Sequence, residues 1–383
     1  MTRPLIMDKY IISHITQLPE ALQIDWQDGY RSLFHYVWLR DNDARMQNSI
    51  GQQSNNILHI PLDIKPTHIT LNETLNITWS ENSDVSCIDP TWLRENAYEP
   101  DKAHKHRPPL HPWKVADFSH HIEFFHYPDL SDDEGIMRSM LQHLRDFGFS
   151  ILKDVPPKPG MVLKVLELFG YPFETHHNKM WEIKVIPTSE DIGDTDQTLP
   201  AHIDQPYRCS SPTITMLHFL SNSLEGGDST LVDGFRLAED LRHQDPDKFE
   251  LLTTIPVEYR YHDDKTDLQC EGTIIELNAR KEVIGIRMNP FSIQPFHVAP
   301  EKMMNFYAAY QKFVQMTEDT TYKLTLKLET GNLLLIDNIR MLHGRHAYEN
   351  NSGERILQGC FSKQDDFWSK LRVLNRRFNV NPS

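Results

Sequence analysis

Short apolar runs in the second half of the chain constrain the fold more than any other feature. Each is rich in Ile, Leu, Val or Phe and is separated from the next by Gly, Asn or Pro, and they lie at residues 213–220, 229–235, 282–288, 332–338 and 355–361. Runs of this length with such boundaries are typical of strands. Because few helical segments occur among them, they favour a double-sheet jelly-roll over alternating βαβ units.

Three segments with helical spacing indicate helices that would flank the sheets. Ser131 and Glu134 form a capping-box pair before a run of apolar residues, and Gly148 would end that helix. A shorter helix is expected over 160–169, and a third begins at Pro300. The predicted fold class is therefore mainly β with flanking helices.

The first hundred residues predict a separate small domain. Runs typical of strands occur at residues 23–41, 57–62 and 75–79. Residues 99–112 combine charge, histidines and prolines, which favours a linker. We therefore expect a β-rich N-terminal domain over 1–108 and a catalytic domain over 109–383.

The acidic balance of the chain argues against anionic partners. Its 39 Lys and Arg residues and 54 Asp and Glu residues give a formal charge of −15, so the overall field does not favour nucleic acid or an anionic membrane surface. No apolar run approaches the roughly 20 residues that span a bilayer, and the opening apolar stretch is too short for a secretory signal. We expect a cytoplasmic protein with a small-molecule substrate.

Cysteine usage agrees with that expectation. The 4 cysteines are widely scattered and include no CxxC pair. This spacing fits neither a disulfide framework nor a thiolate zinc site, so a reducing compartment is expected.

A candidate metal motif lies at His202-Ile-Asp204. Residues two apart on a strand point to the same side, so both side chains can reach one ion. An HxD pair often arises by chance, and a lone His or Asp near a turn is usually structural. His343, just after a later apolar run, would complete the 2-His-1-carboxylate triad of non-heme Fe(II) oxygenases.

That triad leaves three coordination positions open, which suits 2-oxoglutarate as a chelator together with O2. An arginine is then needed for the far carboxylate of 2-oxoglutarate. Arg355 lies on the next apolar run and could grip it in a bidentate pair. The alternative for Arg355 is an ordinary surface ion pair.

Several longer motifs carry a family resemblance. In the second domain they are HIDQPYR, LEGGDSTLVDGF, LLIDNIRMLHGRHAYE and RILQGCFSKQDDFWSKLRVL, and in the first DWQDGYRSLFHYVWLRDN and WLRENAYE. Together they resemble the γ-butyrobetaine hydroxylase and trimethyllysine hydroxylase group of the taurine-dioxygenase-like Fe(II)- and 2-oxoglutarate-dependent oxygenases. The likeness covers nearly the whole chain.

The resemblance implies a double-stranded β-helix, cupin-like catalytic domain. The implied iron ligands and 2-oxoglutarate anchor are His202, Asp204, His343 and Arg355. Ser229 and Leu217 fall where matching positions line the co-substrate pocket; in the alternative, Ser229 caps a turn and Leu217 belongs to the core. The implied reaction releases succinate and CO2 as the substrate is hydroxylated, with desaturation or ring formation as alternatives.

The sequence departs from the family at the zinc site of the N-terminal domain. Related domains often carry cysteines just after the WLRDN stretch and a later histidine. Here residues 42–46 read NDARM, no cysteine precedes Cys87, and residues 79–83 contain no histidine. Structural zinc is therefore expected to be absent.

A second departure concerns the substrate pocket. Betaine-specific members surround the trimethylammonium group with aromatic rings, which attract it through cation–π contacts. Trp181 matches one such position, whereas the others fall on His177, Asp194 and Gln205. A carboxylate there could accept N–H bonds from a primary or partly methylated amine, unless it only solvates a loop. Candidates for the acidic end of the substrate are Tyr207, Arg208, Arg287 and Asn289.

The leading interpretation is a hydroxylase of a small zwitterionic amine or betaine-like substrate. One alternative is a biosynthetic tailoring oxygenase that acts on an amino acid or related metabolite. An alternative of another class is a catalytically silent protein that binds metal and 2-oxoglutarate. Apolar residues at helical spacing in 367–378, together with the frequency of dimers among relatives, favour a homodimer.

Overall fold

Two compact units make up the chain in a computed structural model, one of residues 1–108 and the other of residues 109–382. The residues that the structure describes are 10–54, 56–81, 84–98, 110–118, 122–184, 195–223, 225–349 and 353–378. Asp194, expected at the substrate pocket, lies outside them. Among the described residues, no helix has the length and apolarity needed to cross a membrane.

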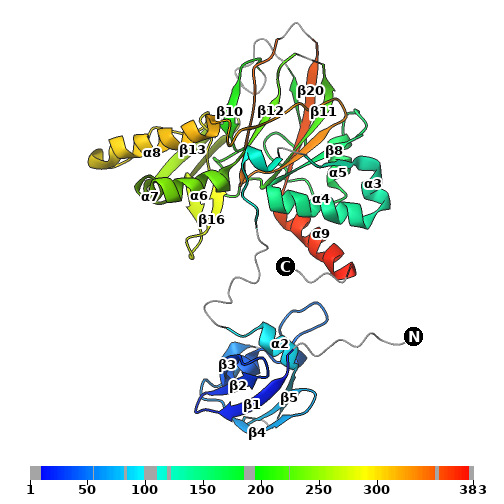
Figure 1. The fold of residues 1–383 in the computed structure, drawn as a ribbon, viewed down its shortest axis with the longest axis vertical. Coiled ribbons are helices and arrows are strands. Elements are labelled where there is room, and N and C mark those ends of the chain that lie inside the picture. Colours follow the sequence, from blue (N-terminus) through cyan, green and yellow to red (C-terminus); the bar gives the residue numbers. More distant parts are fainter. Residues whose placement is uncertain are drawn as a thin grey trace. The chain divides into compact units, whose positions relative to one another are not determined.

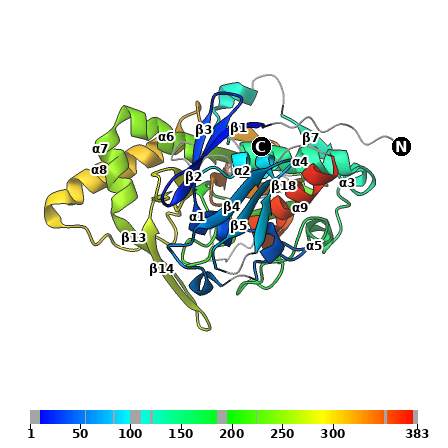
Figure 2. The same ribbon diagram turned by 90° about the horizontal axis from the view of Figure 1, so that it is seen from below.

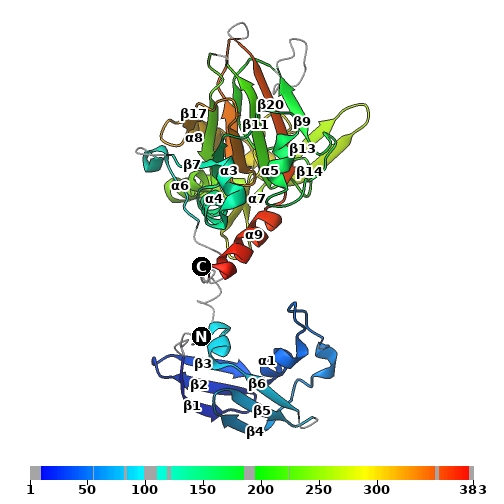
Figure 3. The ribbon, with the colours of Figure 1, turned by 90° about the vertical axis from the view of Figure 1, so that its right-hand side faces the viewer.

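The N-terminal unit contains two antiparallel sheets (Figure 3). The first consists of β1 (Ile12–Gln17), β2 (Ala21–Trp26) and β3 (Arg31–His35), and the second of β4 (Pro66–Leu71), β5 (Leu75–Trp79) and β6 (Val85–Ile88). The short helices α1 (Tyr36–Asp41) and α2 (Pro90–Glu95) accompany them. Alternate residues of two strands enter the core, as expected for strands with one buried face: Leu22, Ile24, Trp26, Leu75, Ile77 and Trp79.

Two of the strand predictions for this unit need correction. Residues Ile57–His59 form a 3-10 helix, because the side chain of Asn56 accepts the N–H of Leu58 and offers the backbone a local alternative to a strand. The alternation over 23–41 ends in helix α1 rather than continuing as a strand.

A buried carboxylate occupies the segment in which the sequence lacks the zinc-site cysteines. Asp43 is fully buried and accepts hydrogen bonds from the Arg45 guanidinium at 2.6 Å and from Ser86 Oγ at 2.5 Å. Ser86 in turn accepts from Trp79 Nε1 at 2.7 Å. Burial acts to raise the pKa of Asp43, but the hydrogen bonds from Arg45 and Ser86 outweigh it and lower that pKa. Side-chain hydrogen bonds thus tie the 3-10 helix Ala44–Met46, which Asp43 caps, to the second sheet.

Two larger sheets form the framework of the second unit (Figure 1). One has the order β7 (Phe124–His126), β8 (Phe149–Lys153), β18 (Leu333–Asp337), β11 (Ile214–Asn222), β20 (Arg355–Ser362), β9 (Trp181–Lys184). The other has the order β10 (Leu199–His202), β19 (Met341–Arg345), β12 (Ser229–Asp233), β17 (Leu324–Leu326). One apolar cluster draws on both sheets, so they face each other across it: Phe149, Ile151, Phe219, Leu231, Leu324, Leu334 and Leu357 are among its members.

Helices cover the other face of the six-stranded sheet. The helices α4 (Glu134–Phe147) and α9 (Gln364–Arg377) lie side by side, with α3 (Tyr127–Asp132) and α5 (Met161–Leu166) nearby (Figures 1 and 3). Leu144 and Leu371 share an apolar cluster with Met216 and Leu333 of the sheet. The apolar face of α9, expected to pack on a partner, is therefore taken up within this unit.

A second group of elements lies beside the four-stranded sheet. The helices α6 (Gly234–Gln244), α7 (Pro246–Thr254) and α8 (Pro300–Glu318) pack together, and the hairpin of β13 (Pro256–His262) and β14 (Asp267–Thr273) extends away from them (Figure 2). Strands β15 (Ile275–Leu277) and β16 (Val283–Ile286) form a further antiparallel pair.

The predicted helix boundaries are correct at one end of α4 and of α8. Gly148 ends α4 with a φ of +81°, and α8 begins at Pro300. The N-terminal cap of α4 is Asp133, whose carboxylate accepts the Gly135 N–H at 2.6 Å, and not Ser131, which lies in α3. Aspartate and serine are equally good N-cap residues, so Asp133 could take the place that the sequence pattern assigned to Ser131.

A buried carboxyl group at the end of β18 makes stability depend on pH. Burial raises the pKa of Asp337 to about 7, although Arg340 acts in the opposite direction. The folded protein therefore favours the protonated form. The stability that this form contributes is present below pH ~4 and is lost as the pH rises through about 7.

Replacing Asp337 with asparagine is expected to remove this loss. Between pH 5 and pH 8 the free energy of unfolding of Asp337→Asn, relative to that of the unmodified protein, should rise by about 2–3 kcal/mol. Urea unfolding of both proteins at each pH measures the difference. A difference that stays constant over this range would show that Asp337 titrates normally.

Candidate metal centre

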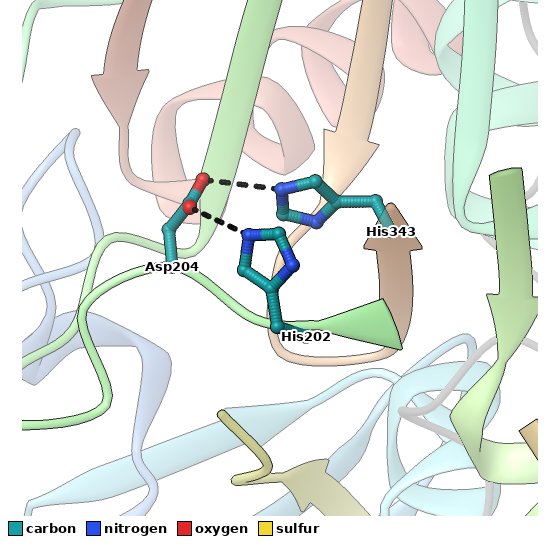
Figure 4. Close-up of side chains that lie close together, drawn as sticks. All are labelled: His202, Asp204 and His343. Atoms are coloured by element: carbon teal, nitrogen blue, oxygen red, sulfur yellow. Dashed lines mark ion pairs between the residues drawn. The ribbon is translucent and has the colours of Figure 1, made fainter. Parts of the chain in front are cut away.

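Two histidines meet across neighbouring strands of the four-stranded sheet. His202 ends β10 and is the direct partner of His343 on β19, with ring centroids 4.4 Å apart. Asp204 follows two residues later, with its Oδ1 3.7 Å from His202 Nε2 and its Oδ2 3.5 Å from His343 Nε2 (Figure 4). The three ligand atoms lie within 4.8 Å of one another. The structure therefore brings the predicted triad together.

The protonation states of these groups suit a metal ion. His202 Nδ1 lies 2.9 Å from the Pro200 carbonyl and can only donate to it, which leaves Nε2 as the ring nitrogen that is available to a metal ion. Burial, above all, lowers the pKa of His343. Burial acts to raise the pKa of Asp204, but the attraction and hydrogen bonds of His343 and His202, when these rings carry a proton, outweigh it and lower that pKa. A carboxylate and neutral imidazoles are the forms that bind metal.

Residues that the sequence interpretation missed hold Asp204 in place. Thr215 Oγ1 donates to Asp204 Oδ2 at 2.9 Å. The buried amide of Asn338 accepts the Asp204 N–H at 2.8 Å and donates to the Asp204 carbonyl at 3.0 Å. Such supporting hydrogen bonds fix the direction of a ligand. Asn338 belongs to the quoted LLIDNIRMLHGR motif, whereas nothing in the sequence marks Thr215.

The site fits Fe(II) on the chemistry of its donors. Two imidazole nitrogens and one carboxylate on one side of an ion leave its remaining positions open, as in non-heme Fe(II) oxygenases. The Asp204 side chain is 22% exposed and the two histidine side chains are 9% exposed. Small molecules can therefore approach on the Asp204 side.

Arg355 is a buried cation on the six-stranded sheet. It begins β20, is 7% exposed, and its Nε has no hydrogen-bond partner among the described residues. Its guanidinium carbon lies 5.7 Å from the centroid of the Phe219 ring and 5.8 Å from that of Tyr348. Burial, and then the charge of Arg345, lowers the pKa of Arg355 to about 10. A buried guanidinium beside a second cation is a favourable place for an anion to bind.

Leu217 and Ser229, the two other residues expected at the co-substrate pocket, lie on β11 and β12. Leu217 is on β11 and contacts the apolar cluster between the sheets, as Phe219 does two residues later. Ser229 begins β12, where it is the direct partner of Arg345 on β19. Leu217 is on the same strand as Thr215, the residue that donates to Asp204. Ser229 is on the strand that pairs with the strand of His343.

Trp181 begins β9, at the edge of the six-stranded sheet, and its ring covers a position on the neighbouring strand that has no side chain. Its ring packs over Gly359, where a Cβ would come within 2.5 Å of the ring, and its centroid is 4.0 Å from that of Phe361. Gly359 and Phe361 are the direct partners of Leu217 and Thr215 on β11. The ring therefore lies on the face of β20 that points toward Thr215.

The remaining expected substrate residues fall into two groups. His177 and Tyr207 both contact the ring of Tyr261, with centroids at 6.2 Å and 5.3 Å, and Gln205 is buried next to Asp204. Arg287 instead donates to Glu276 at 2.7 Å and to the Pro206 carbonyl at 2.6 Å. The amide of Asn289 donates to the Ile203 carbonyl at 2.9 Å. Arg287 and Asn289 thus hold the backbone around the metal motif.

Comparison with known proteins agrees with this class of site. The family described as taurine catabolism dioxygenase TauD, TfdA family, matches residues 108–361. The chain is 32% identical to a gamma-butyrobetaine dioxygenase of Pseudomonas sp. (strain AK-1), over 98% of each chain. It is 27% identical to a trimethyllysine dioxygenase of Meyerozyma guilliermondii, over 93% of this chain and 94% of the relative. It is 30% identical to the mitochondrial trimethyllysine dioxygenase of Homo sapiens, over 89% and 82%.

Fold, ligand set and relatives define a non-heme iron oxygenase. The chain belongs to the taurine catabolism dioxygenase TauD, TfdA family. It is a dioxygenase, and the expected family and reaction class are confirmed.

Proposed function

We propose that this dioxygenase hydroxylates a small zwitterionic amine or betaine-like substrate with Fe(II), 2-oxoglutarate and O2, and releases succinate and CO2. The observation that carries the proposal is the convergence of His202, Asp204 and His343 within 4.8 Å. When bound, Fe(II) supplies O2 activation driven by oxidative decarboxylation of 2-oxoglutarate. The chain's own residues position both substrates and exclude water.

Arg355 would bind the far carboxylate of 2-oxoglutarate, because its buried Nε has no partner among the described residues. Thr215, which holds Asp204, and Phe219, which lies under Arg355, are four residues apart on one face of β11, or about 13 Å. Leu217 stands midway between them. A five-carbon dicarboxylate that reaches from the metal toward Arg355 would therefore pass over Leu217, with Ser229 on the facing sheet.

The amine end of the substrate would lie near Trp181. Its indole ring can attract a cationic ammonium group through a cation–π contact. The names of the relatives make gamma-butyrobetaine and trimethyllysine the first substrates to test. Asp194, a carboxylate where betaine-specific relatives have a ring, favours an amine that retains N–H groups.

We further infer that the two facing sheets form a double-stranded β-helix and that the boundary near residue 108 separates it from an accessory domain. Action in the cytoplasm agrees with 4 cysteines that are all free thiols. A homodimer stays part of the proposal, without support from α9.

The proposal is tested by reconstituting the full chain anaerobically with Fe(II), adding O2, and recording succinate formed from 2-oxoglutarate. The panel contains gamma-butyrobetaine, trimethyllysine, primary amines, amino acids and phosphonates, and His202→Ala serves as the control. We expect one class of compound to stimulate succinate formation in the unmodified protein and none to do so in the variant. Metal binding without turnover under any condition would instead indicate a silent binder.

A further inference from the structure

Arg208 joins two side chains next to the metal motif. Its Nε donates to Gln205 Oε1 at 2.6 Å, and its Nη2 donates to His176 Nδ1 at 2.9 Å. These two nitrogens lie on the same edge of the planar guanidinium. The amide of Gln205 and the imidazole of His176 are therefore held side by side.

Because arginine can only donate hydrogen bonds, it fixes the role of each partner. The oxygen of the Gln205 amide must face Arg208, so Nε2 points away from it. His176 Nδ1 must carry a lone pair, so the proton of the neutral ring is on Nε2. Burial, followed by the charges of His177 and Arg208, lowers the pKa of His176 to about 4, which keeps the ring neutral at pH 7.

Neither of these two N–H donors has an acceptor among the residues that the structure describes. The Nε2 atoms of Gln205 and His176 are buried and have no hydrogen-bond partner within the described part of the chain. Gln205 is only 4% exposed and has a φ of +52°, a left-handed conformation that is unfavourable for a residue other than glycine. Buried unpaired donors in a strained backbone are a feature of ligand sites.

We propose that His176 Nε2 and Gln205 Nε2 bind a hydrogen-bond acceptor of the substrate, namely its carboxylate, and that Arg208 is the positioning residue that fixes both donors. The assignment rests on the proposed function, since it concerns the same pocket: Gln205 adjoins Asp204. The His176 ring packs on Tyr261 and Tyr207, with centroids at 4.5 Å and 6.2 Å. Two N–H donors beside a guanidinium disfavour an ammonium group here, so the amine end would lie elsewhere in the pocket.

The first test examines the fixed tautomer and needs no substrate. Nitrogen NMR of full-length protein labelled with 15N-histidine should show His176 as a neutral ring protonated on Nε2 at pH 7. In Arg208→Met the constraint is lost, and both tautomers should be populated. A ring protonated on Nδ1 in the unmodified protein would overturn the assignment.

The second test measures binding to the anaerobic complex of the full chain with Fe(II) and 2-oxoglutarate. The probes are 4-(trimethylammonio)butanoate and 4-aminobutanoate, each compared with its decarboxylated amine. His176→Phe keeps a ring but loses the donor, and it should bind the carboxylate probes about 10- to 100-fold more weakly while its affinity for the decarboxylated amines is unchanged. His176→Gln, which restores a donor, should recover much of that loss.

Equal losses for acids and amines, or no binding of either acid to the unmodified protein, would overturn the proposal. Neither readout depends on turnover. A failure of the proposed function would be seen separately, as the absence of succinate formation in the unmodified protein.

Discussion

Replacing Asp204 with alanine is expected to abolish succinate formation and to weaken metal binding severely. The variant removes the only carboxylate of the triad, and the two neutral imidazoles that remain cannot balance the charge of a divalent ion. The affinity for Fe(II) should fall by more than the 10- to 100-fold typical of losing a supporting hydrogen bond. Anaerobic metal titration and a succinate assay measure the two effects.

Thr215→Val is the matched comparison for this variant. It removes the hydroxyl that donates to Asp204 Oδ2 and keeps the shape of the side chain. Metal affinity should therefore fall by about 10- to 100-fold, less than in Asp204→Ala. Metal affinity that is unchanged in Asp204→Ala would remove Asp204 from the ligand set.

Replacing Arg355 with methionine is expected to raise the KM for 2-oxoglutarate by about 30-fold or more. The variant fills a similar volume but leaves the far carboxylate of the co-substrate unpaired in a buried site, and losing one partner of such a pair costs about 2–5 kcal/mol. Metal affinity without 2-oxoglutarate should be unaffected, because Arg355 is not among the metal ligands. Initial rates at varied 2-oxoglutarate and a metal titration separate the two effects.

Two further variants give this prediction its control. Arg355→Lys retains the charge but not the forked geometry, so its KM should lie between those of the unmodified protein and Arg355→Met. Arg260→Met removes an arginine that pairs with Asp267 on the β13–β14 hairpin and should leave the KM unchanged. A normal KM in Arg355→Met would show that another group holds the carboxylate.

Much of the site could be predicted from the sequence because its key residues belong to recognisable local patterns. The two-residue spacing of His202 and Asp204 places both side chains on one side of the chain end. The apolar runs that precede His343 and begin at Arg355 identify strands, and the strand period then limits where these side chains point. The capping choice at α4 and the 3-10 helix at Ile57–His59 were missed, because neighbouring polar side chains compete for the same backbone groups.

The supporting residues could not be predicted in the same way. Asn338 bonds to the backbone of Asp204 across 134 positions in the chain, and His176 meets Arg208 across 32 positions. No local pattern records such pairs, because they exist only once separate strands and loops have packed together. The same holds for α9, whose apolar face fits a partner subunit as well as it fits α4 until the packing is known.

The sequence by itself thus determined the family and most of the strands named above, and it predicted the residues that we propose hold iron and 2-oxoglutarate. The tertiary structure alone decided which polar atoms are paired and which are left buried without a partner. The physical reason is that side-chain chemistry and strand period are local properties, whereas hydrogen-bond saturation depends on every neighbour that folding brings into contact. The donors of His176 and Gln205, and the Nε of Arg355, became visible only at that level.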